Sequence, residues 1–349
     1  MLHSTIKRLA SSPVEHDAKA LGQDGESLGG LLAAGSAPMV LRELASHWPA
    51  CKIKDDEQFA NYLLGFYNGK DLGCFVGDSA IQGRFFYKED YQALNFENTR
   101  RKLGDVLGQI LKQNQLSSDE QSSFYIGSAT TSAFLEGFET ENALPPRSER
   151  VITTPIASSW IGNQSRISCH YDTPDNLAVC VHGEREIVLF PPECIEGLYP
   201  GPLSMTPAGQ VVSVVDFHAP DFERYPKFEE ALKRAIVLQL APGDAVYIPS
   251  MWWHHIEALS PLNMLVNYWW HTNPPWIGQS ITALHTALLA LKDLPAEQRA
   301  AWASIFDYYI FTSEHRHQHL PVDARELIGE SSPLDARKLR AMINQRLNQ

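Results

Sequence analysis

The stretch Ile167-Ser-Cys-His170-Tyr-Asp172-Thr-Pro-Asp-Asn176 places a histidine and a carboxylate two residues apart. Side chains at positions i and i+2 of a β-strand point to the same face, so His170 and Asp172 are expected to converge. A second stretch, Ile248-Pro-Ser-Met-Trp-Trp-His254-His255-Ile-Glu257, supplies further histidines later in the chain. Together the two stretches predict a β-rich fold with a polar cluster on an inner face.

Only one of the neighbours His254 and His255 can share that inner face, because adjacent strand residues point to opposite sides. His254 has the parity of the apolar Ile256, whereas His255 has the parity of Glu257. We therefore expect His254 to face inward, and His255 to face outward and bond to Glu257.

Two histidines and one carboxylate with open neighbouring positions form the facial triad of non-haem iron(II) oxygenases. His170, Asp172 and His254 are therefore the candidate metal ligands and the candidate catalytic centre. The default for any other histidine is a hydrogen-bonded core or surface residue. That default applies to His182, His218, His271, His285 and the cluster His315-Arg-His317-Gln-His319, for which a solvated turn is predicted.

Short β segments separated by Gly/Pro turns fill residues 151–270. Strands are predicted near 156–161, 166–171, 176–182, 186–190, 211–216, 236–240, 245–249, 253–258 and 263–270. The intervening sequence shows almost no helix, apart from a polar helical insert at 220–234. This spacing is typical of a β-sandwich or barrel.

The flanking regions are more helical. Apolar spacing predicts helices over 54–66, 98–115, 281–291, 296–311 and 334–347, with short strands at 38–44, 73–76, 83–87 and 123–127. Residues 1–30 are predicted to be a loosely held arm with a helical piece. The chain is accordingly divided into an N-terminal mixed α/β region (1–120), a β domain with the catalytic site (121–273) and a C-terminal helical region (274–349).

Charge and cysteine content narrow the class of protein. The 349 residues carry a formal net charge of −12 without a basic stripe, which makes nucleic acid an unfavourable partner. Five cysteines without a C-x-x-C pair favour reduced thiols. No secretory signal and no apolar run of membrane-spanning length is present, so a cytoplasmic protein that does not bind membranes is expected.

Four segments resemble the cupin-like JmjC hydroxylases, and among these the asparaginyl hydroxylases. The segments are His170-Tyr-Asp172, Leu189-Phe-Pro-Pro-Glu193, Pro242-Gly-Asp-Ala-Val-Tyr-Ile-Pro249 and Trp252-Trp-His254-His-Ile-Glu257. The resemblance implies a mainly β fold with appended helices, built on an eight-stranded double-stranded β-helix. It also implies Fe(II), 2-oxoglutarate as cosubstrate, and a homodimer interface formed by the C-terminal helices.

The resemblance further implies a set of cosubstrate-binding residues. Arg185 stands where the family has a lysine for the far carboxylate of 2-oxoglutarate, and a guanidinium can hold a carboxylate through two hydrogen bonds. Tyr125 matches a tyrosine that reaches the same carboxylate. Asn176 and Asn267 match two asparagines that line the pocket, and Trp269 matches an aromatic residue near the substrate.

These positions also have ordinary explanations. Arg185 is alternatively a surface charge among glutamates, and Tyr125 and Trp269 are alternatively packing residues. Ile167 departs from the family, which has a threonine there, and the neighbouring Ser168 is expected to face away.

The implied activity is hydroxylation of an unactivated C–H, with release of succinate and CO2, on a protein or peptide side chain. One alternative is the same oxygenase acting on a small molecule or a tRNA base. Another is a cupin-type metal-binding protein or isomerase without oxygenase activity. Cupins of that last kind usually carry extra histidine and glutamate ligands near the first motif, where this chain has only Asp175.

Overall fold

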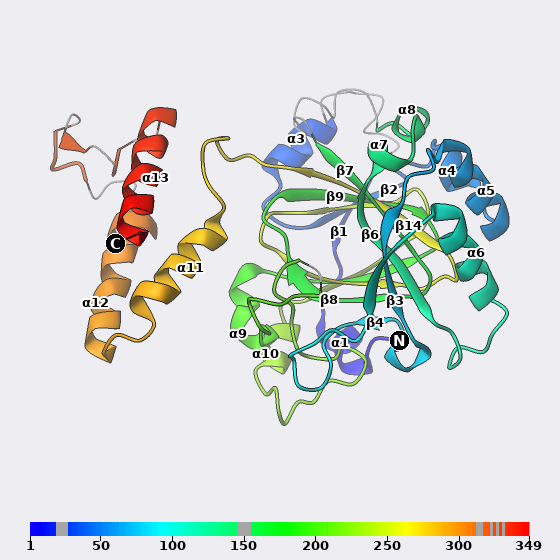
Figure 1. Cartoon of the computed structure of the whole chain (residues 1–349), viewed down its shortest axis with the longest axis horizontal. Helices are drawn as coiled ribbons and strands as arrows, with labels where there is room; N and C mark the ends of the chain where they lie inside the picture. Colours follow the sequence, from blue (N-terminus) through cyan, green and yellow to red (C-terminus); the bar gives the residue numbers. More distant parts are fainter. Residues whose placement is uncertain are drawn as a thin grey trace. The chain divides into compact units, whose positions relative to one another are not determined.

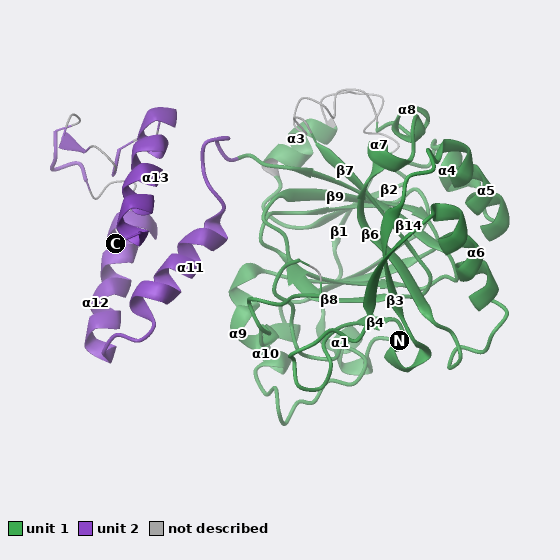
Figure 2. Ribbon diagram, viewed as in Figure 1, with its two compact units in different colours: residues 1–272 green, residues 273–349 purple. Residues whose placement is uncertain are grey.

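A computed structural model describes residues 1–18, 27–144, 155–207, 209–311, 317–321, 324–325, 328–329 and 332–348. The chain divides into two compact units, Met1–Thr272 and Asn273–Gln349 (Figure 2). The first is called the β unit and the second the helical unit. The finer boundary between residues 120 and 121 stays a prediction.

The strands of the β unit form two sheets (Figure 1). The larger sheet has the order β1-β2-β12-β9-β14-β7-β6-β3-β5, and the smaller has the order β11-β10-β13-β8-β4. The strands are β1 (Val14–Asp17), β2 (Met39–Arg42), β3 (Leu72–Gly77), β4 (Arg84–Phe85), β5 (Glu97–Arg101), β6 (Ser123–Thr130), β7 (Ile156–Gly162), β8 (Arg166–Tyr171), β9 (Asp175–His182), β10 (Arg185–Phe190), β11 (Ile236–Leu240), β12 (Ala245–Ile248), β13 (Trp253–Ala258) and β14 (Asn263–Trp270).

Strands β7 to β14 form the core of the fold. Strands β12, β9, β14 and β7 adjoin in the larger sheet, and β11, β10, β13 and β8 adjoin in the smaller one. This arrangement confirms the predicted mainly β fold with an eight-stranded double-stranded β-helix and appended helices.

Both faces of the core sheets are buried. Ile187 and Leu189 of β10 point between the sheets, into a cluster that also contains Ile256 of β13. Val188 and Phe190 point to the opposite face, into a second apolar cluster. Because both faces are covered, β10 has the sequence Arg-Glu-Ile-Val-Leu-Phe, without polar alternation after its first two residues.

Helices cover the outer faces of the two sheets. Residues of α1, α9 and α10 pack on the smaller sheet, and residues of α3, α4, α5 and α6 pack on the larger one. The helices of the β unit are α1 (Ser4–Leu9), α3 (Ser27–Ala34), α4 (Pro49–Lys52), α5 (Asp56–Phe66), α6 (Leu103–Gln113), α7 (Thr131–Phe134), α8 (Phe138–Glu141), α9 (Ile195–Leu198) and α10 (Phe228–Leu232), with 3-10 turns at Ser79–Ile81 and Pro192–Cys194. All five cysteines are free and buried in this unit.

Three elements predicted for the β unit differ in the structure, and the helical insert predicted over 220–234 is reduced to α10. The helix expected over 98–115 begins only at Leu103, because the polar residues before it form edge strand β5. No strand forms at 211–216, where only isolated bridges join Val212 to His170 and Ser213 to Pro200. The start of the expected loose arm is held in place, because Ile6 is fully buried and β1 pairs with β2.

The helical unit contains α11 (Ser280–Leu291), α12 (Ala296–Phe306), a π-helical turn at Asp307–Phe311, and α13 (Pro333–Leu347). The solvated turn predicted around the histidine cluster was wrong for His317, which is buried against the rings of Tyr308 and Tyr309. His319 is exposed, and His315 lies outside the described residues. Among the helices described in either unit, none is long and apolar enough to cross a membrane.

Candidate metal centre and adjoining pocket

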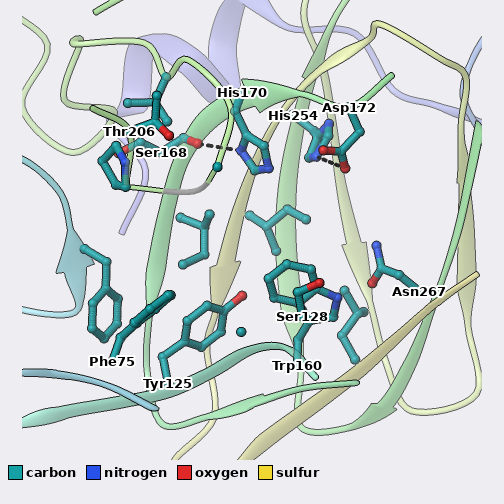
Figure 3. Close-up of a pocket in the computed structure, with 18 of the residues that line it drawn as sticks. Phe75, Tyr125, Ser128, Trp160, Ser168, His170, Asp172, Thr206, His254 and Asn267 are labelled. Atoms are coloured by element: carbon teal, nitrogen blue, oxygen red, sulfur yellow. Dashed lines mark hydrogen bonds and ion pairs between the residues drawn. The ribbon is translucent and has the colours of Figure 1, made fainter. Parts of the chain in front are cut away.

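The structure brings His170, Asp172 and His254 together (Figure 3). Strands β8 and β13 are antiparallel neighbours, and His254 lies directly opposite His170 in their register. One ligand atom from each of the three residues lies within 4.8 Å of the other two. The two imidazole rings are 4.3 Å apart, and His254 Nε2 lies 3.6 Å from Asp172 Oδ2.

Both imidazoles are oriented by backbone carbonyls. His170 Nδ1 donates to the Ser168 carbonyl at 2.9 Å, and His254 Nδ1 donates to the Trp252 carbonyl at 3.0 Å. These bonds leave Nε2 as the lone-pair nitrogen in each ring, which is how protein environments fix metal-binding histidines. Burial lowers the pKa of His254, and the neighbouring His170 lowers it further. A neutral imidazole is the form that binds a metal.

Asp172 lies just after β8 and is fixed by the turn that precedes β13. Met251 N donates to the Asp172 carbonyl at 2.8 Å, and the hydroxyl of Ser250 donates to the Thr173 carbonyl at 2.6 Å. Met251 has a φ of 69°, a left-handed conformation that non-glycine residues seldom adopt. The turn thus joins the first ligand stretch to the second one by main-chain contacts.

The triad opens into a cavity of about 340 Å³ whose wall includes Arg185 and Tyr125. The size is in the range of small-molecule sites. Arg185 is 1% exposed, and its Nε and Nη2 atoms have no hydrogen-bond partner. Burial lowers the pKa of Arg185, and burial raises that of Tyr125 although Arg185 opposes the rise. The alternative of a surface charge does not fit this position.

Two asparagines lie side by side on β9 and β14. Asn267 Nδ2 donates to Asn176 Oδ1 at 2.9 Å. Asn267 lines the cavity, whereas Asn176 stands behind it and is not part of the lining. Asn176 Nδ2 and Asn267 Oδ1 remain without a partner. The pair therefore still has one donor and one acceptor available.

The expectation that Ser168 faces away from the site was wrong, because Ser168 and Ile167 both line the cavity. Ser168 shares the parity of His170, so alternation itself places it on this side. Ile167 reaches the cavity because the register of β8 and β13 shifts between His254 and Ile256. Such bulges are common beside active sites. Strand parity alone could not have revealed this shift.

Trp160 is a lining residue that the sequence did not single out. It lies on β7, and its ring is 5.9 Å from that of Tyr125 and 5.8 Å from that of Trp269. The aromatic residue in a predicted strand was visible, but nothing in the sequence set it apart from a core residue. Trp269 also lines the cavity, as the resemblance implied.

His255 points away from the triad as expected, but it does not reach solvent. It is 5% exposed, and its Nε2 lies 2.8 Å from Glu257 Oε1. The Glu257 carboxylate also accepts from His218, which lies in the chain segment covering the smaller sheet. Burial raises the pKa of Glu257, but the two histidine contacts outweigh it and lower that pKa. His255 therefore belongs to a buried network behind β13.

The donor set fits a metal of the iron type. Two imidazole nitrogens and one carboxylate on one side of a cavity suit divalent iron, and the cavity leaves the other side accessible. The orphaned N–H groups of Arg185 fit a carboxylate, because a buried guanidinium is otherwise costly.

Comparison with known proteins agrees with the geometry. A family model described as a cupin-like domain matches residues 31–275. The lysine-specific demethylase JMJ31 of Arabidopsis thaliana is 36% identical over 115 residues, which cover 33% of this chain and 20% of that protein. HSPB1-associated protein 1 of Homo sapiens is 30% identical over 146 residues, which cover 40% of this chain and 29% of that protein.

A third relative is the tRNA wybutosine-synthesizing protein 5 of Gallus gallus. It is 31% identical over 149 residues, which cover 38% of this chain and 44% of that protein. The chain therefore spans less than half the length of each of these three relatives.

Proposed function

We infer the function from the premise that the chain belongs to the family of cupin-like domains. The proposal is an Fe(II)- and 2-oxoglutarate-dependent dioxygenase that hydroxylates an unactivated C–H of a protein or peptide side chain. The observation that carries it is the pairing, in one cavity, of the triad with the unpartnered guanidinium of Arg185.

The cavity residues form two groups, one that would bind the metal and one that would bind the cosubstrate. His170, Asp172 and His254 would hold Fe(II), and Arg185 with Tyr125 would hold the far carboxylate of 2-oxoglutarate. When bound, iron with this cosubstrate supplies the oxidation of the C–H by O2, with 2-oxoglutarate converted to succinate and CO2. Asn267 lines the same cavity, and its side-chain carbonyl oxygen has no hydrogen-bond partner.

The chain itself contributes orientation and a dry environment. The Ser168 and Trp252 carbonyls fix the tautomers of the two histidines, so each presents Nε2 to the metal. The apolar side chains of Ile167, Ile256 and Leu265 line the cavity beside them. Water is thereby displaced from the reacting C–H, which limits side reactions.

Arg185 distinguishes this site from a metal-binding cupin without an acidic cosubstrate. A buried guanidinium whose Nε and Nη2 atoms lack partners needs an anion, and the described lining offers no carboxylate except the ligand Asp172. The planar guanidinium binds a carboxylate through two hydrogen bonds, whereas the lysine of the family acts as a point charge.

A small-molecule or tRNA substrate is the runner-up. One relative is named as a tRNA wybutosine-synthesizing protein. The net charge of −12 disfavours an RNA partner for this chain.

The proposal is tested by measuring succinate formed from 2-oxoglutarate with Fe(II) and O2, without added substrate and then with peptide mixtures. The wild type is expected to form succinate slowly and to be accelerated by a peptide substrate. Absence of succinate from an iron-loaded protein would overturn the proposal, and acceleration only by tRNA or small molecules would favour the runner-up.

We also propose that the helical unit associates with the same unit of a second copy. No residue of α11, α12 or α13 is buried, although Leu289, Trp302 and Ile343 are apolar. Isolated helices of this length are marginal in water, and their stability comes from packing an apolar face. Another copy of the same chain is the partner we propose for these apolar residues, because a twofold interface would cover the same residues on both copies.

A further inference from the structure

One turn of the chain contacts two of the three candidate metal ligands. It runs from Pro249 to Trp252, and Trp252 N donates to the Pro249 carbonyl at 3.2 Å. Met251 N donates to the carbonyl of Asp172 at 2.8 Å. The Trp252 carbonyl accepts from Nδ1 of His254 at 3.0 Å. The position of this turn therefore sets the backbone of one ligand and the ring of another, which lie side by side in Figure 3.

The turn has a conformation that its own residues do not favour. Met251 has a φ of 69°, and a turn whose third residue has a positive φ usually has glycine or asparagine at that position. The side chain of Met251 is 40% exposed, so packing holds it only weakly. A residue in such a conformation persists where the surrounding structure fixes it. The turn therefore needs support from outside its own four residues.

Asp175 provides this support from the start of β9. Its Oδ1 accepts from Ser250 N at 3.2 Å and from the Tyr247 hydroxyl at 2.7 Å. Burial raises the pKa of Tyr247, and Asp175 raises it further, so the hydroxyl keeps its proton and donates. Tyr247 is buried in β12, the strand that leads into the turn. The carboxylate thus joins the turn to a fixed strand.

Asp175 is not placed as a fourth metal ligand. Among the described residues, the one cluster with metal-ligand spacing is the triad, and Asp175 does not belong to it. Asp175 is also absent from the lining of the cavity. It is the carboxylate beside the first motif that a metal-binding cupin could have used as an extra ligand. Its contacts indicate a role in orienting ligands rather than in binding the metal.

Asp244 shows what an ordinary turn-stabilising aspartate does in this unit. Its carboxylate accepts from Glu43 N at 2.9 Å and Ala241 N at 3.2 Å, and it pairs with Arg42 at 2.7 Å. Neither Asp244 nor any of these partners lines the cavity. Asp244 is therefore a matched control, because it holds backbone as Asp175 does but has no contact with the turn before β13.

We propose that Asp175 is a positioning residue for the metal centre. It holds Ser250, and the turn that contains Ser250 holds the backbone of Asp172 and the ring of His254. This inference rests on the proposed function, because it takes the triad as the metal site. Loss of the Asp175 carboxylate therefore weakens metal binding while all three ligands remain in the chain.

The affinity for Fe(II) provides the first test. It is measured anaerobically on the full chain, without 2-oxoglutarate, by competition with a coloured chelator. Asp175→Ala is expected to weaken the affinity roughly 10- to 100-fold, as is usual when a group that orients metal ligands is lost. Asp175→Asn keeps an oxygen acceptor for both donors and is expected to retain most of the affinity. Asp244→Ala is expected to bind Fe(II) as the wild type does.

Amide hydrogen exchange in the metal-free protein provides the second test. Asp175→Ala is expected to speed exchange in the peptide that contains Ser250 and Met251, because their N–H groups lose a fixed partner or a fixed position. Asp244→Ala is expected to leave that peptide unchanged. Tyr247→Phe removes one of the two donors to Asp175. It replaces Asp175→Ala if that variant does not fold, and smaller changes in the same direction are expected.

Three results would overturn the inference: wild-type affinity in Asp175→Ala, an equal loss in Asp244→Ala, or a complete loss in Asp175→Asn. The two tests also separate this inference from the proposed function. If the wild type binds no Fe(II), the proposed function fails, and hydrogen exchange still decides whether Asp175 holds the turn. If the wild type binds Fe(II) and Asp175→Ala changes neither affinity nor exchange, only the positioning role fails.

Discussion

In the β unit, Leu63 of α5 is fully buried, whereas in the helical unit Leu289 of α11 is 78% exposed. The same contrast holds across the two units. Sheets and helices of the β unit cover one another and hold the candidate metal ligands between them. Helices α11 to α13 expose apolar side chains at helical spacing and bury none. The β unit therefore holds the candidate site among packed elements, whereas the helical unit leaves apolar side chains exposed, as the proposed association requires.

The largest effect is expected from removing a candidate metal ligand of the β unit, compared with removing a histidine of the helical unit. His254→Ala removes a metal ligand, so iron affinity and succinate formation are expected to fall more than about a hundredfold. Iron content by elemental analysis and succinate by mass spectrometry provide the measurement.

His285→Ala is the matched control, since His285 is an exposed histidine of α11. The contrast between the units would be contradicted if both variants lost activity equally.

A pair of leucine variants tests the energetic contrast. Leu63→Ala leaves a cavity in the core and is expected to lower the free energy of unfolding by roughly 2–5 kcal/mol. Leu289→Ala is expected to lower it by less than about 0.5 kcal/mol in the monomer, since surface changes have small effects. Urea unfolding followed by tryptophan fluorescence measures both, and similar losses in a dilute monomer would break the comparison.

Association of the helical unit is tested on α13. Leu339 and Ile343 are each 40% exposed and lie four residues apart, on one face. Leu339→Glu with Ile343→Glu is expected to convert a dimer into a monomer, measured by analytical ultracentrifugation. Asn344→Glu with Asn348→Glu adds the same charge at the same spacing and should leave the dimer intact. A monomeric wild type at micromolar concentration would refute the dimer.

The smallest expected effect concerns pH. Burial lowers the pKa of His255 in the folded state. The unfolded chain therefore binds a proton more readily below about pH 6.5, and the β unit loses stability as the pH falls. One such group contributes at most about 1.4 kcal/mol per pH unit. Urea midpoints of metal-free protein at pH 7.5 and 5.5 measure the slope.

His255→Phe is expected to flatten that slope, and His285→Ala is expected to keep it. Identical slopes in the wild type and His255→Phe would show that His255 does not carry the effect.

The sequence was sufficient for local patterns with strong periodicity. The parity of His254 and the strands from 156 to 270 follow from alternation and turns, and the structure has eight of the nine predicted strands. The failures arise where tertiary contacts override the pattern. Val212 only bridges His170, and the polar strand β5 takes residues expected in a helix.

The candidate site was likewise predictable where a residue pattern identifies it, and not where tertiary contacts decide which side chains line the cavity. His170, Asp172 and His254 were visible because a metal needs fixed residue types at fixed parity. Trp160 was not, because a tryptophan in a strand has the same pattern whether it packs in the core or lines a cavity. The position of Ile167 at the cavity depends on a register shift between two strands, which no single strand encodes, whereas the side taken by Ser168 follows from the parity of His170.

The central claim is that the triad and Arg185 serve one iron-cosubstrate site. The most direct measurement is an anaerobic titration of the protein with Fe(II) and 2-oxoglutarate, followed through the weak visible charge-transfer band that the family resemblance implies. The account predicts a band in the wild type, its loss in His254→Ala, and a weaker apparent affinity for 2-oxoglutarate in Arg185→Ala. No band in the wild type, together with tight binding of another divalent metal, would contradict it.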